Sequence, residues 1–582
     1  GYYWITAGLE MNEFSRQLKR GTALALVGLA TLATWQQTDR QADAQPVGQA
    51  FGPSEVHSYI VQASSSSEAI SFVQAAGGTT GYELESIRGT EARLSRQAVE
   101  KLMALHPDLS ISDNVSVELT GRKDRGNEAA ALAYAHAPSM IGATELLASG
   151  ISGRGVNVAI LDTGLHGSKP TFRDTHEGEH RYVALYDVDG GLEETYGFYG
   201  DQNGHGSHVA SLIAGSETFG GRHTGVAPGV GLVSVRAFDA NGQASYARVI
   251  EAIEWVIANR GAYAIRVLNL SISAPARSHY WDDPLNQAVM TAWKAGIVVV
   301  ASAGNLGPDP MTIGVPGNNP YVITVGAMTD NYTPNDISDD LLASFSSAGP
   351  THEGFVKPEI IAPGGHLRGY MSRHSSIAKA HSEFMADDRT HFVMSGTSQA
   401  AAVVSGVAAL MLEVDPTLNP DQVKCRLMAS ARPRIDENGV PAYSVFQQGA
   451  GMISAPDAVY GTALGCANQG LDIKADLAGT QHFGGPANRD ADGNYYIMDM
   501  NADEFGAPVG SDGFLWSNGF LWSNGFLWSN GFLWSNAFFW SNGFLWSNGF
   551  LWSNSYNLAA TDHSNSYATV SSDLGGVSVN VW

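Results

Sequence analysis

The pattern of apolar and polar positions predicts a small mixed module near the start of the chain. Between residues 56 and 119, short β-branched runs alternate with amphipathic stretches in the order strand, helix, strand, strand, helix, strand. That order is typical of a ferredoxin-like α+β module. The expected strands are residues 56–62, two around Arg88-Gly89 within 82–94, and 110–119, and the expected helices are residues 65–76 and 96–105.

From residue 140 to about 466 the pattern changes to continuous apolar runs separated by longer helical stretches. Such runs are typical of strands buried on both faces, so we expect an α/β fold with a mostly parallel sheet covered by helices. Functional residues of these sheets gather beyond the carboxyl ends of the strands. The expected strands are residues 156–161, 230–237, 267–272, 297–301 and 322–325, and the expected helices are 205–215, 245–259 and 284–295.

Beyond Cys466 the chain becomes rich in glycine, asparagine and aspartate and then repeats a six-residue unit. Residues 513–554 hold seven tandem copies, six reading GFLWSN and one, at 537–542, reading AFFWSN. Six residues advance a helix by about 600°, so helical tryptophans would form no single stripe. Asn-Gly after a short aromatic run is a hairpin signal and favours a β-rich region. The repeat is interpreted as a self-packed β appendage or an aggregation-prone tail. The alternative is an aromatic platform that binds a polymer or cell surface, or that assembles copies of the chain.

Composition, cysteines and the N-terminal pattern limit partners and location. The formal net charge of -24 argues against a nucleic-acid partner, which would require clustered Lys and Arg. Cys425 and Cys466 could form one disulfide or remain two free thiols. Residues 1–10 read as a translated segment upstream of a start at Met11. Residues 11–44 have the basic start, apolar run and Ala42-Asp43-Ala44 cleavage motif of a secretory signal, so we expect a secreted protein.

Four polar residues stand at the ends of expected strands or helices. Asp162 and Asn305 follow strands, His205 begins a helix between two glycines, and Ser398 lies in a Gly-Thr-Ser turn before a long apolar run. A serine becomes a nucleophile only when a base and an orienting acid activate it. Singly, each residue has an ordinary role in a turn, cap or loop. Together they predict an Asp-His-Ser triad with an amide donor, whereas His208 is expected to be structural.

On these four residues and the sequence motifs around them, the chain resembles the subtilases, the subtilisin-like serine proteases, over roughly residues 56–465. The resemblance implies a serine endopeptidase in which Ser398 is the nucleophile, His205 the base and Asp162 the orienting acid. Asn305 and the Ser398 backbone N–H would form the oxyanion hole. The matching motifs are AILDTG at 159–164, NGHGSHVA at 203–210, ASAGN at 301–305 and MSGTSQAA at 394–401.

The resemblance also implies a self-processing precursor. Residues 45–125 stand where the family has its propeptide, which assists folding and acts as an intramolecular inhibitor until it is removed. Residues 126–465 would form the peptidase domain, which acts on protein or peptide substrates, and residues 466–582 a C-terminal region. The alternative is a surface or matrix protein whose protease-like domain supports the aromatic repeat.

Departures from the family pattern bear on substrate specificity. Ser271, Ile272, Ser273 and Gly304 are the expected substrate-binding residues, and Ser271-Ile272-Ser273-Ala274 stands where the family often has Ser-Leu-Gly-Gly. We therefore expect a narrowed primary specificity pocket. An insertion at roughly residues 365–390, just before the nucleophile, is interpreted as a surface loop, with a lid or a wall of the substrate groove as the alternative.

No metal ligand is assigned from the sequence. Ser168-Lys169-Pro170-Thr171 stands where the family usually has a His-Pro-Asp segment, and the lost acid puts the family's commonest calcium site in doubt. Residues 490–494 start like a calcium loop but continue with Tyr495 in place of glycine. Residues 490–494 are therefore interpreted as a turn. No cofactor is expected for catalysis, and structural calcium is possible but unsupported.

Overall fold

The computed structural model describes residues 55–122 and 134–499, except 167–169, 174–179, 193–199, 220, 334–338, 437–439 and 491. It also describes the backbone of four short strands within residues 507–581. The expected signal segment, most of the linker after residue 122 and the repeats at 513–554 lie outside the described residues and stay predictions. The chain divides into two compact units, residues 1–57 with 95–97 and residues 58–94 with 98–582.

The expected α+β module is present at the start of the described chain. Its sheet has the strand order β2-β3-β1-β4, as a ferredoxin-like connection requires. The Ser65 side chain caps the first helix by accepting a hydrogen bond from the Glu68 backbone N–H at 3.2 Å. The elements are β1 (Val56–Gln62), α2 (Ser66–Ala75), β2 (Thr79–Leu84), β3 (Gly89–Ser95), α3 (Arg96–Leu105) and β4 (Ser110–Asp113).

The expected strand at residues 110–119 is in fact two strands, which corrects that prediction. β4 closes the sheet of the module, whereas β5 (Ser116–Leu119) pairs antiparallel with β13 (Gln243–Ser245) and β15 (Ile272–Ser273). Asn114 lies in the break and accepts a hydrogen bond from the Ala247 backbone N–H at 2.9 Å. The partners of β5 lie more than 100 residues away in the chain, so the local apolar pattern could not separate the two strands.

A nine-stranded sheet forms the centre of the larger domain, and its core confirms the predicted α/β fold. The strand order is β18-β17-β16-β14-β7-β12-β8-β9, with β19 beside β17. All pairs from β8 through β17 to β19 are parallel. The strands are β7 (Asn157–Asp162), β8 (Tyr182–Asp187), β9 (Gly191–Leu192), β12 (Gly231–Arg236), β14 (Ile265–Leu270), β16 (Val298–Ser302), β17 (Ile323–Thr329), β18 (Leu341–Leu342) and β19 (Ile360–Pro363).

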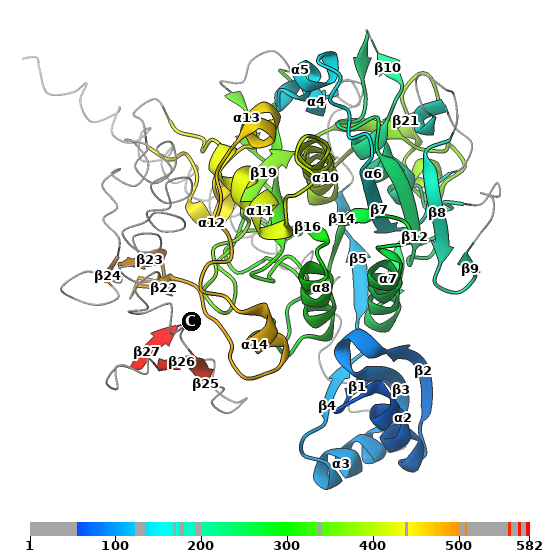
Figure 1. Ribbon diagram of the computed structural model, residues 1–582, viewed down its shortest axis with the longest axis vertical. Coiled ribbons are helices and arrows are strands. Elements are labelled where there is room, and N and C mark those ends of the chain that lie inside the picture. Colours follow the sequence, from blue (N-terminus) through cyan, green and yellow to red (C-terminus); the bar gives the residue numbers. More distant parts are fainter. Residues whose placement is uncertain are drawn as a thin grey trace, which may run out of the picture. The chain divides into compact units, whose positions relative to one another are not determined.

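Helices cover both faces of this sheet (Figure 1). α7 (Tyr246–Asn259) and α8 (Pro284–Lys294) pack together on one face, and α6 (His205–Ala214) and α10 (Thr397–Val414) pack together on the other. α10 is long and apolar enough to cross a membrane by length and composition, but 89% of it is buried inside the protein. Its apolar character is therefore explained by its place in the core.

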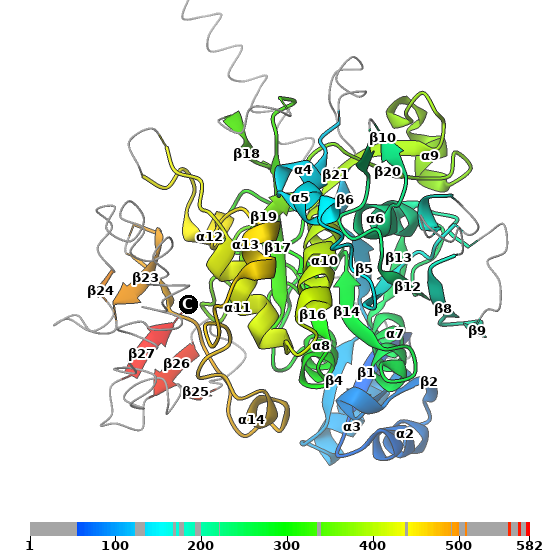
Figure 2. The same ribbon diagram turned by 45° about the horizontal axis from the view of Figure 1, so that its top comes forward.

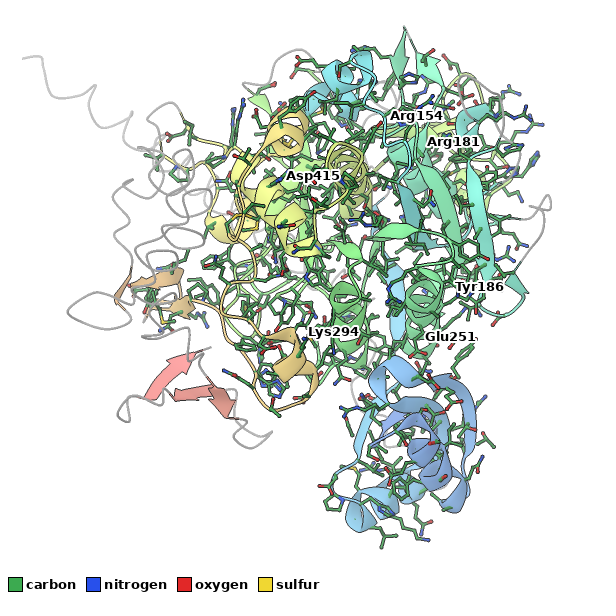
Figure 3. The ribbon with its side chains drawn as sticks, in the orientation of Figure 1. Arg154, Arg181, Tyr186, Glu251, Lys294 and Asp415 are labelled. Carbon is green, nitrogen blue, oxygen red and sulfur yellow. A yellow bond between two sulfur atoms is a disulfide. The ribbon has the colours of Figure 1, made fainter. Side chains whose placement is uncertain are left out.

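Strand β8 is an element that the apolar pattern did not predict. Arg181, just before β8, donates hydrogen bonds to the carbonyls of Val230 and Thr171, and Figure 3 labels it together with Tyr186. The Tyr186 ring stacks on Trp255 of α7, with ring centroids 4.4 Å apart. β8 reads YVALYD, so it carries an apolar run of its own that the expected strands did not include.

The described part of the C-terminal region, residues 466–499, packs on the core of the larger domain (Figure 2). Cys425 and Cys466 form a disulfide with Cα atoms 5.0 Å apart, which settles the open choice between a disulfide and free thiols. The Asp476 carboxylate is buried and accepts hydrogen bonds from the Tyr280 hydroxyl at 2.6 Å and the Tyr321 hydroxyl at 3.0 Å. Residues beyond Cys466 therefore contribute to the folded domain.

The remaining elements are shorter or lie at the edges. They are η1 (Glu85–Ile87), β6 (Gly121–Arg122), α4 (Ala137–Met140), α5 (Ala143–Ala148), η2 (Pro170–Phe172), β10 (Thr218–Phe219), β11 (Arg222–His223), β20 (Leu367–Tyr370), α9 (Ser376–Ala380), η4 (Ser382–Phe384), β21 (His391–Gly396), α11 (Pro420–Ser430), α12 (Val445–Gln448), α13 (Ala455–Tyr460), α14 (Ile473–Leu477), β22 (Ala487–Arg489), β23 (Tyr495–Asp499), β24 (Ala507–Pro508), β25 (Asn557–Ala559), β26 (Ala568–Ser571) and β27 (Ser578–Val581).

Candidate active site

Asp162 and His205 meet at the carboxyl end of β7. β7 ends at Asp162, and α6 begins at His205. His205 Nδ1 lies 2.8 Å from Asp162 Oδ1 and 2.9 Å from Oδ2, and both side chains are 1% exposed. A buried carboxylate so close to Nδ1 favours the tautomer that carries its proton on Nδ1, which leaves the Nε2 lone pair available. His205 Nε2 is buried and makes no hydrogen bond to any residue of the described chain.

A second carboxylate, Asp201, organises the turn that presents His205. It accepts hydrogen bonds from the backbone N–H groups of Gly204 at 2.7 Å and Ser207 at 2.8 Å, and from the Thr163 hydroxyl at 2.9 Å. Burial raises the pKa of Asp201, while these hydrogen bonds favour its ionised form. The sequence reasoning missed Asp201; its signal is an acidic residue placed three positions before a Gly-His helix start.

His208, three residues after His205, has a structural environment. Its Nε2 lies 3.1 Å from the carbonyl oxygen of Phe392. Burial lowers the pKa of His208 to about 3, with the nearby His205 as a second cause. A histidine that stays neutral over the whole physiological range cannot act as a titrating base, which agrees with the structural role expected for it.

Ser398 lies in the first turn of α10 and is fully buried. Its Oγ donates a hydrogen bond to the Ser271 carbonyl oxygen at 3.0 Å and lies 2.6 Å from the Thr120 Oγ1. Within the described chain its hydrogen bonds therefore go to Ser271 and Thr120 rather than to His205. The position at a helix N-terminus favours negative charge near Ser398.

Asn305 is fixed against the start of the same helix. Its Oδ1 accepts hydrogen bonds from the Thr397 backbone N–H at 3.1 Å and the Thr397 hydroxyl at 2.9 Å. With that oxygen occupied, the amide Nδ2 donates to the carbonyl oxygen of Thr120. Asn305 and Ser398 thus both contact Thr120, one at its carbonyl and the other at its side chain.

The segment that contains Thr120 crosses this site as an extended strand. On its amino side, β5 pairs antiparallel with β15, and Leu119 lies opposite Ile272. The Thr120 backbone N–H donates to the Ser271 carbonyl at 3.2 Å. On its carboxyl side, β6 (Gly121–Arg122) pairs antiparallel with β21. Addition of a strand to an exposed edge is a common way for a protein to bind an extended peptide.

The expected substrate-binding residues have different contacts in the structure. Ser271 bonds the backbone of Thr120, and Ile272 and Ser273 form the strand opposite Leu119 and Glu118. Gly304 makes a different contact: its backbone N–H donates to the Thr397 hydroxyl at 3.2 Å. The first three therefore touch the crossing strand, whereas Gly304 supports the start of α10.

The insertion at residues 365–390 forms a packed substructure beside the His205 loop. β20 pairs with β21, and the backbone N–H groups of Ser376 and Ile377 donate to the carbonyls of Gln202 at 2.8 Å and Asn203 at 3.2 Å. Apolar side chains of the insertion (Met371, Ala378 and Phe384) and of β21 (Phe392 and Met394) form a separate cluster. The insertion is therefore packed against the turn that precedes His205, and its role as a lid or groove wall stays a prediction.

The described residues contain no group of three or more His, Cys, Asp or Glu side chains placed to hold a metal ion. Asp490 forms the predicted turn, since its Oδ1 accepts from the backbone N–H groups of Asp492 at 3.0 Å and Asn494 at 2.7 Å. Of residues 168–171, where the family's acidic segment is replaced, Ser168 and Lys169 lie outside the described residues. Pro170 and Thr171 begin η2, and the buried Thr171 carries no carboxylate.

The α/β fold of this chain carries Asp, His and Ser in this chain order, with an asparagine amide beside the serine. This is the arrangement of the subtilisin-like serine proteases. The Subtilase family profile matches residues 153–451, and the chain belongs to this family. It is a subtilisin-like serine endopeptidase, which confirms the class predicted from the motifs.

Individual relatives agree with this assignment. The serine protease AprX of Bacillus subtilis is 35% identical over 364 residues, which cover 62% of this chain and 77% of that protein. Subtilisin DY of Bacillus licheniformis is 33% identical over 50% of this chain and 89% of its own length. In a structural comparison, fervidolysin from Fervidobacterium pennivorans, described as a keratinolytic enzyme related to subtilisin, gives a TM-score of 0.56 at 25% identity. That match covers 80% of this chain and 69% of fervidolysin.

Proposed function

We propose that Asp162, His205 and Ser398 act as the catalytic triad of this endopeptidase. The observation that carries the proposal is the hydrogen bond from the Asn305 amide to the Thr120 carbonyl oxygen. Ser398 Oγ lies 2.6 Å from the hydroxyl of the same threonine. Ser398 Oγ attacks the substrate carbonyl carbon while His205 Nε2 takes its proton, and Asp162 holds the imidazole in place. The amine product leaves with that proton, and water then hydrolyses the acyl-enzyme ester.

We assign Asn305 as the side-chain donor of the oxyanion hole, together with the Ser398 backbone N–H. Replacing Asn305 by alanine is expected to lower kcat by about 100- to 1000-fold, since such a donor acts mainly on the transition state. KM should change little. Steady-state kinetics on a peptide substrate check this, and Asn305→Asp, similar in size but without the donor, should be equally impaired. A raised KM at unchanged kcat would make Asn305 a binding residue instead.

The N-terminal module is proposed to be a propeptide that blocks the active site before it is removed. Its strand β5 lies along β15, in the place that an extended substrate would take. Additional contacts join the module to helices α7 and α8. The Ser86 N–H and hydroxyl donate to Glu254 at 2.7 and 2.6 Å, and Gln62 donates to Gln287 at 2.6 Å. These polar contacts support its role as an intramolecular inhibitor.

We propose that self-processing cuts the bond between Thr120 and Gly121, because the Thr120 carbonyl is the one bound by Asn305. This places the cut a few residues before the boundary expected at 125/126. N-terminal sequencing of the purified, processed protein is expected to begin at Gly121 before any trimming of the linker. Early samples of a time course that begin at another residue, with Thr120–Gly121 still intact, would contradict the assignment.

Secretion is proposed from the signal-like pattern of residues 11–44 together with the Cys425–Cys466 disulfide, because disulfides persist in oxidising compartments.

A polymer or cell-surface ligand for the GFLWSN repeat stays a prediction. So does the alternative role as a surface or matrix protein, which active-site labelling would distinguish from a protease.

A further inference from the structure

The side chain of Thr120 is enclosed between two walls of the site. One wall is Ser271-Ile272-Ser273, which pairs with β5, and the other is the end of β16 with Ser302. Thr120 is 5% exposed and Ser302 is fully buried. If Thr120–Gly121 is the bond that is cut, this enclosure is the pocket that binds the side chain on the amino side of the scissile bond. The inference below rests on that proposed function.

The pocket presents a hydrogen-bond acceptor to Thr120. The Ser302 hydroxyl donates its only hydrogen to the Ile272 carbonyl at 2.8 Å. The lone pairs of Ser302 Oγ are therefore left to accept, and the Thr120 hydroxyl donates to them at 2.8 Å. Ser302 Oγ can only accept in this chain of bonds, because a serine hydroxyl has one hydrogen and two lone pairs. The Thr120 hydroxyl also lies 2.6 Å from Ser398 Oγ, whose own hydrogen goes to the Ser271 carbonyl, so Ser398 is a second acceptor for the same hydrogen.

The same pocket has little depth for a large side chain. Ser273 Oγ occupies the space between Gly304 and Gly314. A Cβ atom placed on Gly314 would lie 1.9 Å from this oxygen, and one placed on Gly304 would lie 3.2 Å from it. A hydroxymethyl group therefore fills space that a glycine at position 273 would leave open. This agrees with the narrowed pocket expected from the sequence.

We propose that Ser302 is a specificity-determining residue that selects a small hydroxyl-bearing side chain, threonine above all, immediately before the scissile bond. Threonine and valine have nearly the same shape, but valine would bring a methyl group against the Ser302 oxygen and donate nothing to it. Ser273 excludes larger side chains from the same pocket by occupying its volume. The hydrogen bond and the steric exclusion thus come from two neighbouring strands, β16 and β15.

Internally quenched peptides that copy residues 116–122, with threonine, serine, valine or phenylalanine in place of Thr120, test the proposal on the purified, processed full-length chain. The threonine peptide is expected to exceed the valine peptide by about 10-fold in kcat/KM, since one buried neutral hydrogen bond is lost. The phenylalanine peptide should be the poorest. A valine peptide cleaved as well as the threonine peptide, or a preference for phenylalanine, would overturn the inference while leaving the protease intact.

Ser302→Ala removes the acceptor without adding volume and is expected to bring the threonine-to-valine ratio near unity while valine cleavage persists. Ser405→Ala is the matched control, because Ser405 is also fully buried but donates to Asn269 at 2.9 Å. It should keep the ratio of the unaltered enzyme. An unchanged ratio in Ser302→Ala would contradict the role of Ser302. Failure of the unaltered enzyme to cleave any of the peptides would instead overturn the proposed function, and the inference with it.

Discussion

Replacing Ser398 by alanine is expected to abolish peptide hydrolysis and to leave the Thr120–Gly121 bond uncut. Without Oγ no acyl-enzyme can form, and loss of the nucleophile from a serine protease triad lowers turnover by about a million-fold. The purified variant should therefore remain a precursor that retains its N-terminal module. Intact-mass measurement over several days checks the processing, and a peptide assay checks the turnover.

The control for this variant is Ser405→Ala, which removes a buried hydroxyl from the same helix. It should be processed at a rate similar to that of the unaltered chain. Addition of a small amount of active enzyme to the Ser398→Ala precursor tells whether the bond is accessible to another molecule. Normal processing of purified Ser398→Ala without added enzyme would show that a different group cuts the bond.

Replacing Asp476 by alanine is expected to destabilise the peptidase domain by about 3–5 kcal/mol, because two buried tyrosine hydroxyls lose their acceptor. Asp476 accepts from Tyr280 and Tyr321, and also from His482 Nδ1 at 2.7 Å. Burial, followed by the charge of Asp476, raises the pKa of both tyrosines, so they remain protonated donors. Urea unfolding in the Ser398→Ala background, which prevents self-digestion, measures the loss.

Two comparisons make this prediction specific. Asp476→Asn keeps the shape and one acceptor oxygen, so its loss of unfolding free energy should be clearly smaller. A chain ending after residue 499 should unfold like the full chain, whereas one ending after residue 465 lacks both Cys466 and Asp476 and should be much less stable. Equal stability of the two truncated chains would show that residues 466–499 are not part of the folded domain.

The fold could be predicted well where the apolar pattern reflects local burial. The helix at 96–105 has the predicted bounds, and the central strands and helices lie within a few residues of their predicted positions. The split of residues 110–119 into β4 and β5 could not be predicted. What separates the two strands is a partner, β15, far along the chain, and a strand carries no local sign of which sheet it joins.

The candidate site, too, could be predicted from the sequence only in part. The Gly-His and Gly-Thr-Ser turns pointed to His205 and Ser398, because these backbone shapes and helix starts leave a signal in adjacent residues. For Asp201 the signal is only its place three positions before the Gly-His start, and its contacts with Gly204 and Ser207 are local. Ser302 gave no signal of its own role, although it is fully buried at the site. Its contact with the Thr120 side chain joins residues 182 positions apart and arises only when distant segments meet.

The most direct test of the proposed triad is reaction of the purified, processed protein with a fluorophosphonate, followed by mass-spectrometric mapping of the modified residue. A fluorophosphonate forms a covalent bond only with a serine activated by a base. We expect one adduct, on Ser398, in the processed chain. Processed protein that carries no adduct, or an adduct on a different serine, would contradict the assignment of Ser398 as the nucleophile.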